Sequence, residues 1–248
     1  MKPERPDLIA YLTGKLAGSP HPEGISVPEG GGKFHTDGTV QHWPGNTFIC
    51  HVDPASRAHT ALRAIQEEIK MSRFQRFYTF LPPSSFHMTI FQGLSSTTEM
   101  HGAMPRELRD VPRDDRTRIL MDRAIALDLP ARHRARMVDL FAGKSVTMTG
   151  ADQAEEDALR KTRCKLSEAT GIEERDFDAY VFHITLAYLV EWVTQDTAEE
   201  IADFSRDLTE RFRDEVGTIS FGPVELCNFD TMHAFDRVAF LGSRQADA

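Results

Sequence analysis

The stretch FHMTIF, residues 86–91, has the composition of a buried β-strand, yet a histidine interrupts its apolar run. Residues 182–186, FHITL, repeat the same order of aromatic, histidine, apolar, threonine and apolar residues. Successive side chains of a strand point to opposite faces of the sheet. The first stretch should therefore bury its aromatic and apolar side chains in a core and present His87 and Thr89 together on the other face.

The second stretch should place His183 and Thr185 together in the same way. One such histidine would be explained by a hydrogen bond between a core side chain and a neighbouring backbone carbonyl. The bare His-x-Thr pattern is also expected by chance in about one copy in a chain of this composition. Two copies in matched apolar strands, one in each half of the chain, instead indicate a catalytic site built on rigid strands.

The two halves of the chain share an order of strand, helix and histidine-bearing strand, which indicates a degenerate duplication. The predicted elements in this order are a strand over 46–52, a helix over 55–71 and a strand over 86–94, then a strand over 145–150, a helix over 153–170 and a strand over 179–192. Further helices are predicted over 7–17, 117–129 and 196–216, a hairpin over 33–40, and loops over 18–32 and 95–115. Strands and helices that alternate with hairpin-type returns predict an α+β fold with largely antiparallel sheets flanked by helices.

The composition narrows the class of partner. The chain has 248 residues and a net charge of −9, so a long nucleic acid would be repelled overall, because affinity for its backbone rests on Lys and Arg. We expect a small anionic substrate or at most the end of an oligonucleotide. No apolar stretch is long enough to span a membrane. Charged residues interrupt the N-terminal stretch where a signal peptide would be apolar. The three cysteines lie far apart and form no zinc or disulfide pattern. These features predict a cytoplasmic protein that does not bind membranes.

With both motifs intact, the sequence resembles the two-histidine (2H) phosphoesterases, which have the LigT-like fold and include RNA 2′,3′-cyclic phosphodiesterases. The resemblance covers residues 46–92 and 144–242. It implies a two-lobed α+β fold whose halves are related by a pseudo-twofold axis, with the His-x-Thr strands facing each other across an open cleft. The predicted division of this single domain is an N-terminal extension over 1–45, a first half over 46–143 and a second half over 144–248.

The resemblance also implies roles for the paired residues. His87 and His183 would be the general acid and base, because histidine exchanges protons near neutral pH. Thr89 and Thr185 would donate hydrogen bonds to the non-bridging oxygens of the phosphate. The predicted reaction is metal-independent hydrolysis of a cyclic phosphate or phosphodiester in a nucleotide or RNA end, with no cofactor. Which histidine is the acid stays open.

Two alternatives remain at this level. The same acid–base pair could run the reverse reaction, which would make the protein an RNA-end ligase or transesterase. A protein of another class could bind a phosphorylated nucleotide without turning it over, but the intact histidines favour catalysis.

Other residues are weaker candidates. Asn46 and His51 could line the cleft, and Tyr78 or Trp43 could line it and stack on a base. His51 and Asp53 share a strand face, but they make at most half of a metal site. The segments 1–45 and 95–140 exceed what compact family members need, so they could narrow or cover the cleft. An open groove would suit RNA ends, and a covered one would suit a small nucleotide or sugar phosphate.

Overall fold

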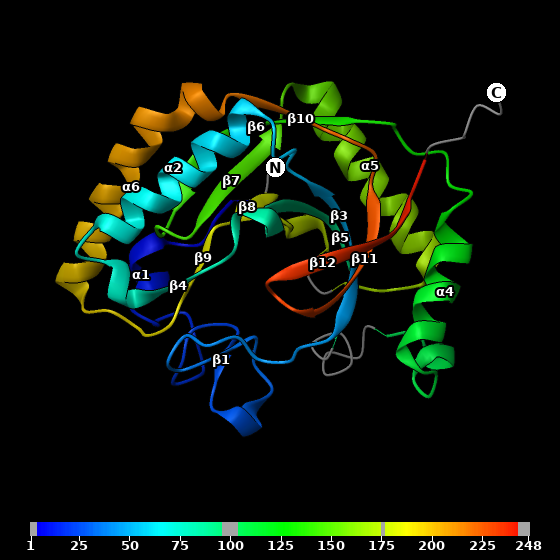
Figure 1. Cartoon of the computed structure of the whole chain (residues 1–248), viewed down its shortest axis with the longest axis horizontal. Coiled ribbons are helices and arrows are strands. Elements are labelled where there is room, and N and C mark those ends of the chain that lie inside the picture. Colours follow the sequence, from blue (N-terminus) through cyan, green and yellow to red (C-terminus); the bar gives the residue numbers. More distant parts are fainter. Residues whose placement is uncertain (1–3, 96–103, 175–176, 243–248) are drawn as a thin grey trace.

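The computed structural model describes residues 4–95, 104–174 and 177–242 (Figure 1). The helices are α1 (Leu8–Leu12), α2 (Arg57–Met71), α4 (Arg113–Ala124), α5 (Gln153–Thr170) and α6 (Gln195–Val216). The strands are β1 (Ile25–Ser26), β2 (Phe34–His35), β3 (Gly45–His51), β4 (Tyr78–Phe80), β5 (His87–Ser95), β6 (His133–Phe141), β7 (Ser145–Gly150), β8 (His183–Thr185), β9 (Ala187–Leu189), β10 (Thr218–Phe221), β11 (Glu225–Thr231) and β12 (Ala234–Phe240). No helix in this described part of the chain has the length and apolarity needed to span a bilayer.

A curled eight-stranded sheet forms the centre of the molecule, with the strand order β10-β6-β7-β8-β5-β3-β11-β12. All of its neighbouring strands are antiparallel, which confirms the predicted α+β class with largely antiparallel pairing. The two histidine-bearing strands, β5 and β8, are direct neighbours in the middle of the sheet, joined through Met88 and Ile184. The two motifs therefore lie side by side on one continuous surface.

The spatial halves of the sheet do not follow the order of the chain. Strand β6 lies within 46–143 in the sequence but pairs with β7 of the following segment. The C-terminal strands β11 and β12 instead extend the sheet beyond β3. Each side of the β5–β8 centre thus contains strands from both parts of the chain.

Most predicted elements are found, and the exceptions have local causes. Helix α5 begins and ends as predicted, with Asp152 accepting a hydrogen bond from the Glu155 N–H at its start and Gly171 in the left-handed region (φ 73°) after its end. The strand predicted over 179–192 is divided, because β8 joins the large sheet whereas β9 pairs with β4 in a separate two-stranded sheet. Two helix predictions were wrong in extent: α1 is shorter than 7–17, and α4 begins before residue 117 and ends at Ala124, ahead of Pro130. The uncertain segment 131–143 contains strand β6, and part of the predicted loop 95–115 (96–103) lies outside the described residues.

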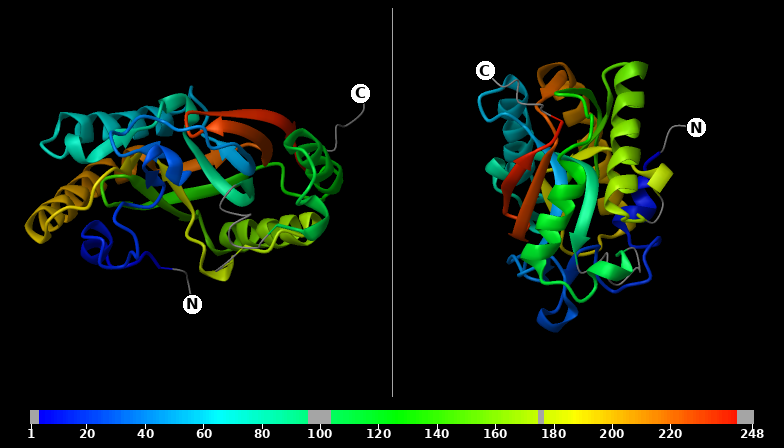
Figure 2. Two further views of the ribbon diagram at one scale, coloured as in Figure 1. Left: turned by 90° about the horizontal axis from the view of Figure 1, so that it is seen from below. Right: turned by 90° about the vertical axis from the view of Figure 1, so that its right-hand side faces the viewer.

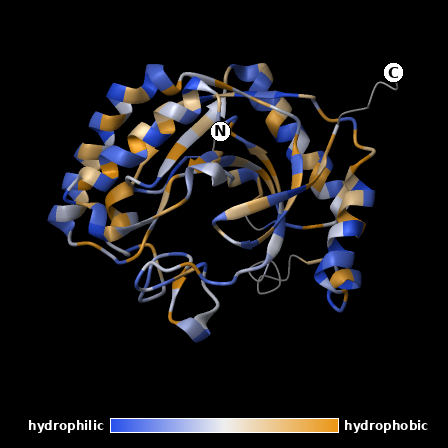
Figure 3. Cartoon of the chain, in the orientation of Figure 1, coloured by the Kyte–Doolittle hydropathy of each residue, from blue (hydrophilic) through white to orange (hydrophobic). Residues whose placement is uncertain are grey.

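Helices cover the sheet at both ends. Helices α2 and α6 pack together at one end, and α4 and α5 lie at the other (Figure 1). The left view of Figure 2 shows α5 and the hairpin β11–β12 on opposite sides of the central strands. Hydrophobic and hydrophilic residues alternate along each helix, as expected for helices with one buried face (Figure 3). The alternation predicted for the motif strands is confirmed, since every apolar partner is at most 1% exposed: Phe86, Met88, Ile90, Phe182, Ile184 and Leu186.

The N-terminal segment 21–43 folds against the open face of the sheet, and a small apolar cluster of its own holds it there. This cluster is separate from the main core and joins the segment to β11 and its turn through Ile25, Phe34, Trp43, Leu81, Phe229 and Met232. The predicted turn at Asp37-Gly38 is present, with Gly38 at φ 83° and the His35 N–H donating to the Thr39 carbonyl. The segment 21–43 is therefore a packed part of the fold and covers part of the open face of the sheet.

A buried arginine fixes the motif strand β5 to helix α5. Arg163 is fully buried and donates one hydrogen bond to the Ile90 carbonyl (2.7 Å) and one to the Glu174 carboxylate (2.6 Å). The same carboxylate accepts a hydrogen bond from the backbone N–H of Gln92 (2.6 Å). The Tyr180 ring lies 4.0 Å from the guanidinium carbon and adds a cation–π contact.

We predict that Arg163→Met destabilises the protein by about 3–5 kcal/mol, because the substitution leaves the Glu174 carboxylate buried without its cation. Urea unfolding monitored by circular dichroism measures the change. Arg206→Met is the matched control: this arginine is 66% exposed in a surface ion pair and should cost less than about 1 kcal/mol. A loss below about 1 kcal/mol for Arg163→Met would show that this network does not hold β5.

Candidate active site

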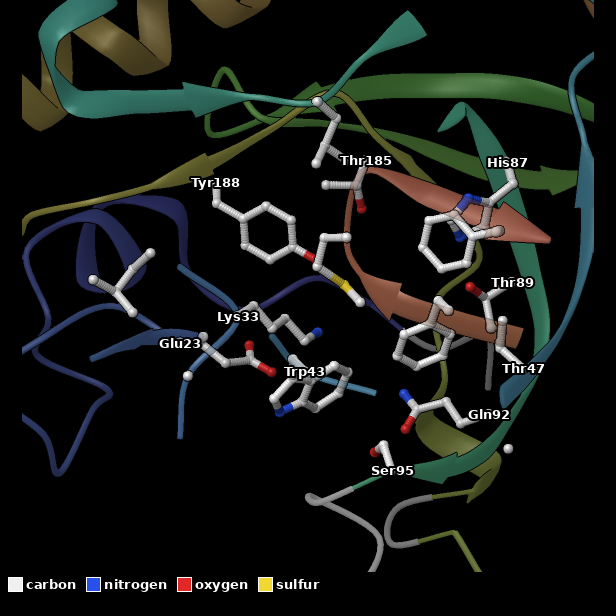
Figure 4. Close-up of a pocket in the computed structure, with 18 of the residues that line it drawn as sticks. Glu23, Lys33, Trp43, Thr47, His87, Thr89, Gln92, Ser95, Thr185 and Tyr188 are labelled. Carbon is white, nitrogen blue, oxygen red and sulfur yellow. The ribbon is translucent and has the colours of Figure 1, made fainter. Parts of the chain in front are cut away.

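The two His-x-Thr pairs line a single cavity of about 440 Å³ on the open face of the sheet (Figure 4). Strands β5 and β8 contribute the four motif residues, and the hairpin β11–β12 closes one side with Phe229 and Phe235. The N-terminal segment closes the opposite side. Its lining residues include Glu23, Ile25, Ser26, Lys33 and Trp43. A cavity of this size holds a ligand the size of a mononucleotide.

Both histidines are held in one tautomer by the same local hydrogen bond. The Nδ1 atom of His87 lies 2.7 Å from the Ser85 carbonyl oxygen, and that of His183 lies 2.8 Å from the Val181 carbonyl oxygen. A carbonyl oxygen only accepts, so Nδ1 carries the proton in each ring. The other ring nitrogen, Nε2, is thereby left as the basic atom of both histidines.

Packing fixes the ring positions further. The Phe235 ring contacts the His87 ring edge to face, with centroids 4.2 Å apart. The Tyr180 ring lies 6.0 Å from His183, and its hydroxyl donates to the Thr89 carbonyl (3.3 Å). These contacts hold both imidazoles in fixed positions on rigid strands.

Burial makes both histidines weak bases in the free protein. Desolvation lowers the pKa of His87 to about 4, although the hydrogen bond to Ser85 opposes the shift. Desolvation also lowers the pKa of His183, to about 3, and the nearby cation Arg5 adds to the effect. Both imidazoles are therefore neutral near pH 7 until an anion enters the cavity.

Three cations surround the pair even though the whole chain is acidic. Arg5 donates hydrogen bonds to Thr147 (3.1 Å) and Ser145 (3.2 Å), the residues of β7 that pair with His183 and Thr185. The charge of Lys144 also disfavours protonation of His183, and that of Lys33 disfavours protonation of His87. The local field of the site is thus positive, which favours an anionic substrate.

The weaker sequence candidates occupy different positions. Asn46 does line the cavity, but its side chain joins three elements by accepting from the Leu94 N–H (2.8 Å) and donating to Thr117 (3.4 Å). Gly93 permits this close approach, because a Cβ there would lie 2.3 Å from the Asn46 backbone oxygen. Trp43 lies in the cavity wall.

Tyr78 and His51 lie away from the cavity lining. Tyr78 is buried in the main core and donates its hydroxyl hydrogen to the Ala142 carbonyl (2.9 Å). His51 is the strand partner of His87, with ring centroids 6.1 Å apart, but it turns its Nδ1 atom to Glu225 (3.0 Å). The structure therefore places His51 beside the histidine pair and Tyr78 outside the site.

His51, Glu225 and Cys227 are close enough to hold a metal ion, since their ligand atoms lie within 4.8 Å of one another. Burial raises the pKa of the Cys227 thiol to about 12, however, and a thiol ligand must be deprotonated. The Arg237 guanidinium also lies 3.3 Å from Glu225. His51, Glu225 and Arg237 form a hydrogen-bonded and ionic network that flanks His87. Asp53, suggested as a partner of His51, does not belong to the cluster.

Several residues of the site carry no signal in the sequence. None of these residues belongs to a motif: Lys33, Gln92, Tyr188 and Phe235 line the cavity, and Arg5 reaches the neighbouring strand β7. Arg5 and Lys33 also lie far from both histidines along the chain. Strict strand alternation from His87 and Thr89 would place Gln92 on the buried face, and the β-bulge in β5 instead brings it to the cavity.

Comparisons with known proteins found a family model and similar solved structures. The family named 2H-phosphodiest, described as a domain of unknown function (DUF1868), matches residues 33–146. The fold is similar to the crystal structure of ATU0111, a conserved protein of unknown function from Agrobacterium tumefaciens str. C58. That likeness has a TM-score of 0.84 and 25% sequence identity, and it covers 95% of this chain and 99% of the other. The crystal structure of TT0787 of Thermus thermophilus aligns with a TM-score of 0.41 at 16% identity, over 81% of this chain and 99% of that one. Among curated proteins, none matches the sequence.

The family match over residues 33–146 and the similar fold of ATU0111 support a relationship to the 2H phosphoesterase superfamily. They support a function of the phosphoesterase type.

The lowered histidine pKa values predict a specific dependence of stability on pH. In the unfolded chain both histidines take up protons as the pH falls through the ordinary value of 6.5, whereas in the folded protein they stay neutral down to about pH 4 for His87 and about pH 3 for His183. The unfolded state then binds more protons, so stability falls as the pH drops from 6.5 towards 4, and these residues contribute no pH dependence above 6.5.

The double variant His87→Gln, His183→Gln should therefore lose less stability than the wild type between pH 6.5 and 4.5. Urea unfolding at each pH measures the two slopes. Equal slopes would mean that the histidines are protonated as easily in the folded protein as in the unfolded chain.

Proposed function

We propose that the protein is a metal-independent phosphoesterase that hydrolyses a cyclic phosphate or phosphodiester of a nucleotide or RNA end. One observation carries the proposal: two histidines on adjacent strands present basic Nε2 atoms to one cavity, each beside a threonine hydroxyl. In-line hydrolysis needs one proton acceptor for the attacking water and one proton donor for the leaving oxygen. The pair supplies both without a metal.

The chemical step balances within this arrangement. One neutral histidine takes a proton from water as the water oxygen forms a bond to phosphorus. The second histidine, in its protonated form, gives its proton to the ribose oxygen as the P–O bond breaks. Thr89 and Thr185 donate hydrogen bonds to the non-bridging oxygens, where charge accumulates. Each turnover leaves the two protonation states exchanged, and solvent restores them.

Charged neighbours distinguish the two histidines and suggest their roles. The cations Arg5 and Lys144 both act on His183 and keep it neutral, which suits a base. His87 is flanked by Lys33 and His51, which disfavour its protonation, but also by the Glu225 carboxylate, which favours it. We therefore assign His183 as the base and His87 as the acid in the hydrolytic direction.

The first test is turnover in the presence of a chelator. Wild-type protein should open nucleoside 2′,3′-cyclic phosphates in EDTA, and either His87→Ala or His183→Ala should lower kcat/KM by about 10²–10⁴. Thr89→Val and Thr185→Val should each cost on the order of 10–10². The control is His42→Ala, at an exposed histidine, which should leave turnover unchanged.

Outcomes of this test also separate the alternatives. Turnover that survives loss of both histidines would refute the acid–base proposal, and turnover abolished by EDTA would refute metal independence. Joining of RNA ends would instead identify a ligase or transesterase. Tight binding of a nucleotide with no product would identify a binding protein.

The role assignment has its own test, which uses a leaving group that needs no proton. A 4-nitrophenyl phosphodiester expels a stabilised phenolate, so loss of the general acid should cost at least about tenfold less on it than on a cyclic ribonucleotide. We expect this recovery for His87→Ala, whereas His183→Ala should be impaired on both substrates to a similar degree. The opposite pattern would reverse the two roles.

A further inference from the structure

Lys33 stands in the cavity wall opposite the histidine pair. Figure 4 shows its side chain entering from the N-terminal segment, on the side of the cavity away from His87 and Thr89. Its ammonium group lies 4.7 Å from the centre of the Trp43 ring and 5.5 Å from that of Tyr188. Two aromatic faces thus hold the ammonium group in place.

This lysine is charged but has no close counter-ion. Burial opposes its charge, yet the neighbouring Tyr188 and Glu23 outweigh burial and raise the pKa of Lys33. Glu23 is exposed, and within the described residues no ion pair of 4.0 Å or less joins it to Lys33. The Tyr188 side chain is a hydrogen-bond partner of the ammonium group, but it carries no full charge, so the half-buried lysine is suited to an anion that arrives from solution.

The contacts of Trp43 argue against the stacking of a nucleobase on its ring. Its ring is stacked on Phe229, with centroids 5.7 Å apart and planes at 20°, and Lys33 lies over the ring as well. A nucleobase that stacked on Trp43 would have to displace the lysine. The aromatic side chain is therefore engaged in holding the cation.

The charges of the site exceed what one phosphodiester needs. Lys33 lines the cavity and disfavours protonation of His87, and Arg5 and Lys144 lie near His183. Glu23 adds one carboxylate to the lining, and a cyclic phosphodiester carries a single negative charge, so positive charge remains in excess. The carboxylate beside His87, that of Glu225, is already shared between His51 and Arg237. The positive charge of Lys33 is therefore left on the N-terminal wall of the cavity. This wall would face the non-reacting part of a substrate.

We propose that Lys33 forms a second anion subsite, which binds a non-reacting phosphate of a doubly phosphorylated substrate. This inference rests on the proposed function, because the first phosphate is placed at the His-x-Thr pairs. A phosphate monoester carries about −1.5 to −2 charges near pH 7, which favours it at a half-buried lysine. The substrate class is then a cyclic phosphate that bears another phosphate elsewhere on a molecule of mononucleotide size.

The test compares adenosine 2′,3′-cyclic phosphate with its 5′-phosphorylated counterpart. Wild-type protein should prefer the 5′-phosphorylated substrate by about tenfold or more in kcat/KM, mainly through KM, as expected for one charge-assisted contact. Lys33→Met should bring the ratio near one, and Lys33→Arg should restore much of it. Lys161→Met, at an exposed lysine of α5, should keep the wild-type ratio. Equal use of both substrates by the wild type, or a preference that persists in Lys33→Met, would overturn the subsite.

A binding measurement keeps this test independent of catalysis. In the inactive His87→Ala, His183→Ala protein, calorimetry should find adenosine 2′,5′-bisphosphate bound about tenfold or more tightly than adenosine 2′-monophosphate, and adding Lys33→Met should remove the difference. If no cyclic phosphate is turned over by the wild type, the proposed function fails, while this comparison still decides on Lys33. Equal affinities for the two ligands would refute the subsite even if turnover is found.

Discussion

The antiparallel contact between β5 and β8 is the constraint on which the site depends. Met88 and Ile184 meet at the centre of the sheet and bury their side chains on one face, so the flanking histidines and threonines must emerge on the other. A shift of one residue in this register would bury both imidazoles in the core and expose both apolar sets. The buried Arg163 stabilises the same strand from behind, through the Ile90 carbonyl and Glu174. Core packing and the geometry of the site therefore depend on a single register.

Local structure, rather than a distant partner, sets the tautomer of each histidine. Both rings donate Nδ1–H to the carbonyl oxygen two residues earlier, Ser85 in one motif and Val181 in the other. A short connection before each strand turns that carbonyl towards the ring. This explains how two segments far apart in the sequence reach the same chemical state through a backbone carbonyl rather than a carboxylate.

The sequence was sufficient for the parts of this design that are periodic, and insufficient for the rest. Alternation in 86–90 and 182–186 predicted which side chains are buried and which face the cavity. The division of 179–192 into β8 and β9 was not predictable in this way, because it depends on pairing with β4. Neither was the N-terminal wall, because Lys33 reaches the cavity only in a fold in which its segment packs against β11 and its turn. Tyr78 shows the opposite error, since an aromatic suited to a nucleotide pocket instead bonds to Ala142 in the core.

The electrostatics of the cavity link the charge of a ligand to the protonation of His87 and His183. Desolvation and the surrounding cations keep both histidines neutral in the empty site, so a general acid is absent there near pH 7. In the proposed mechanism, a bound phosphate would add negative charge beside the two Nε2 atoms and raise the pKa of both, and the Glu225 carboxylate would help His87 to take the proton first. Acid and base would then coexist only when an anion is bound. An acidic protein with a cationic cavity should thus repel long polyanions by its overall charge and retain small ones by its local charge.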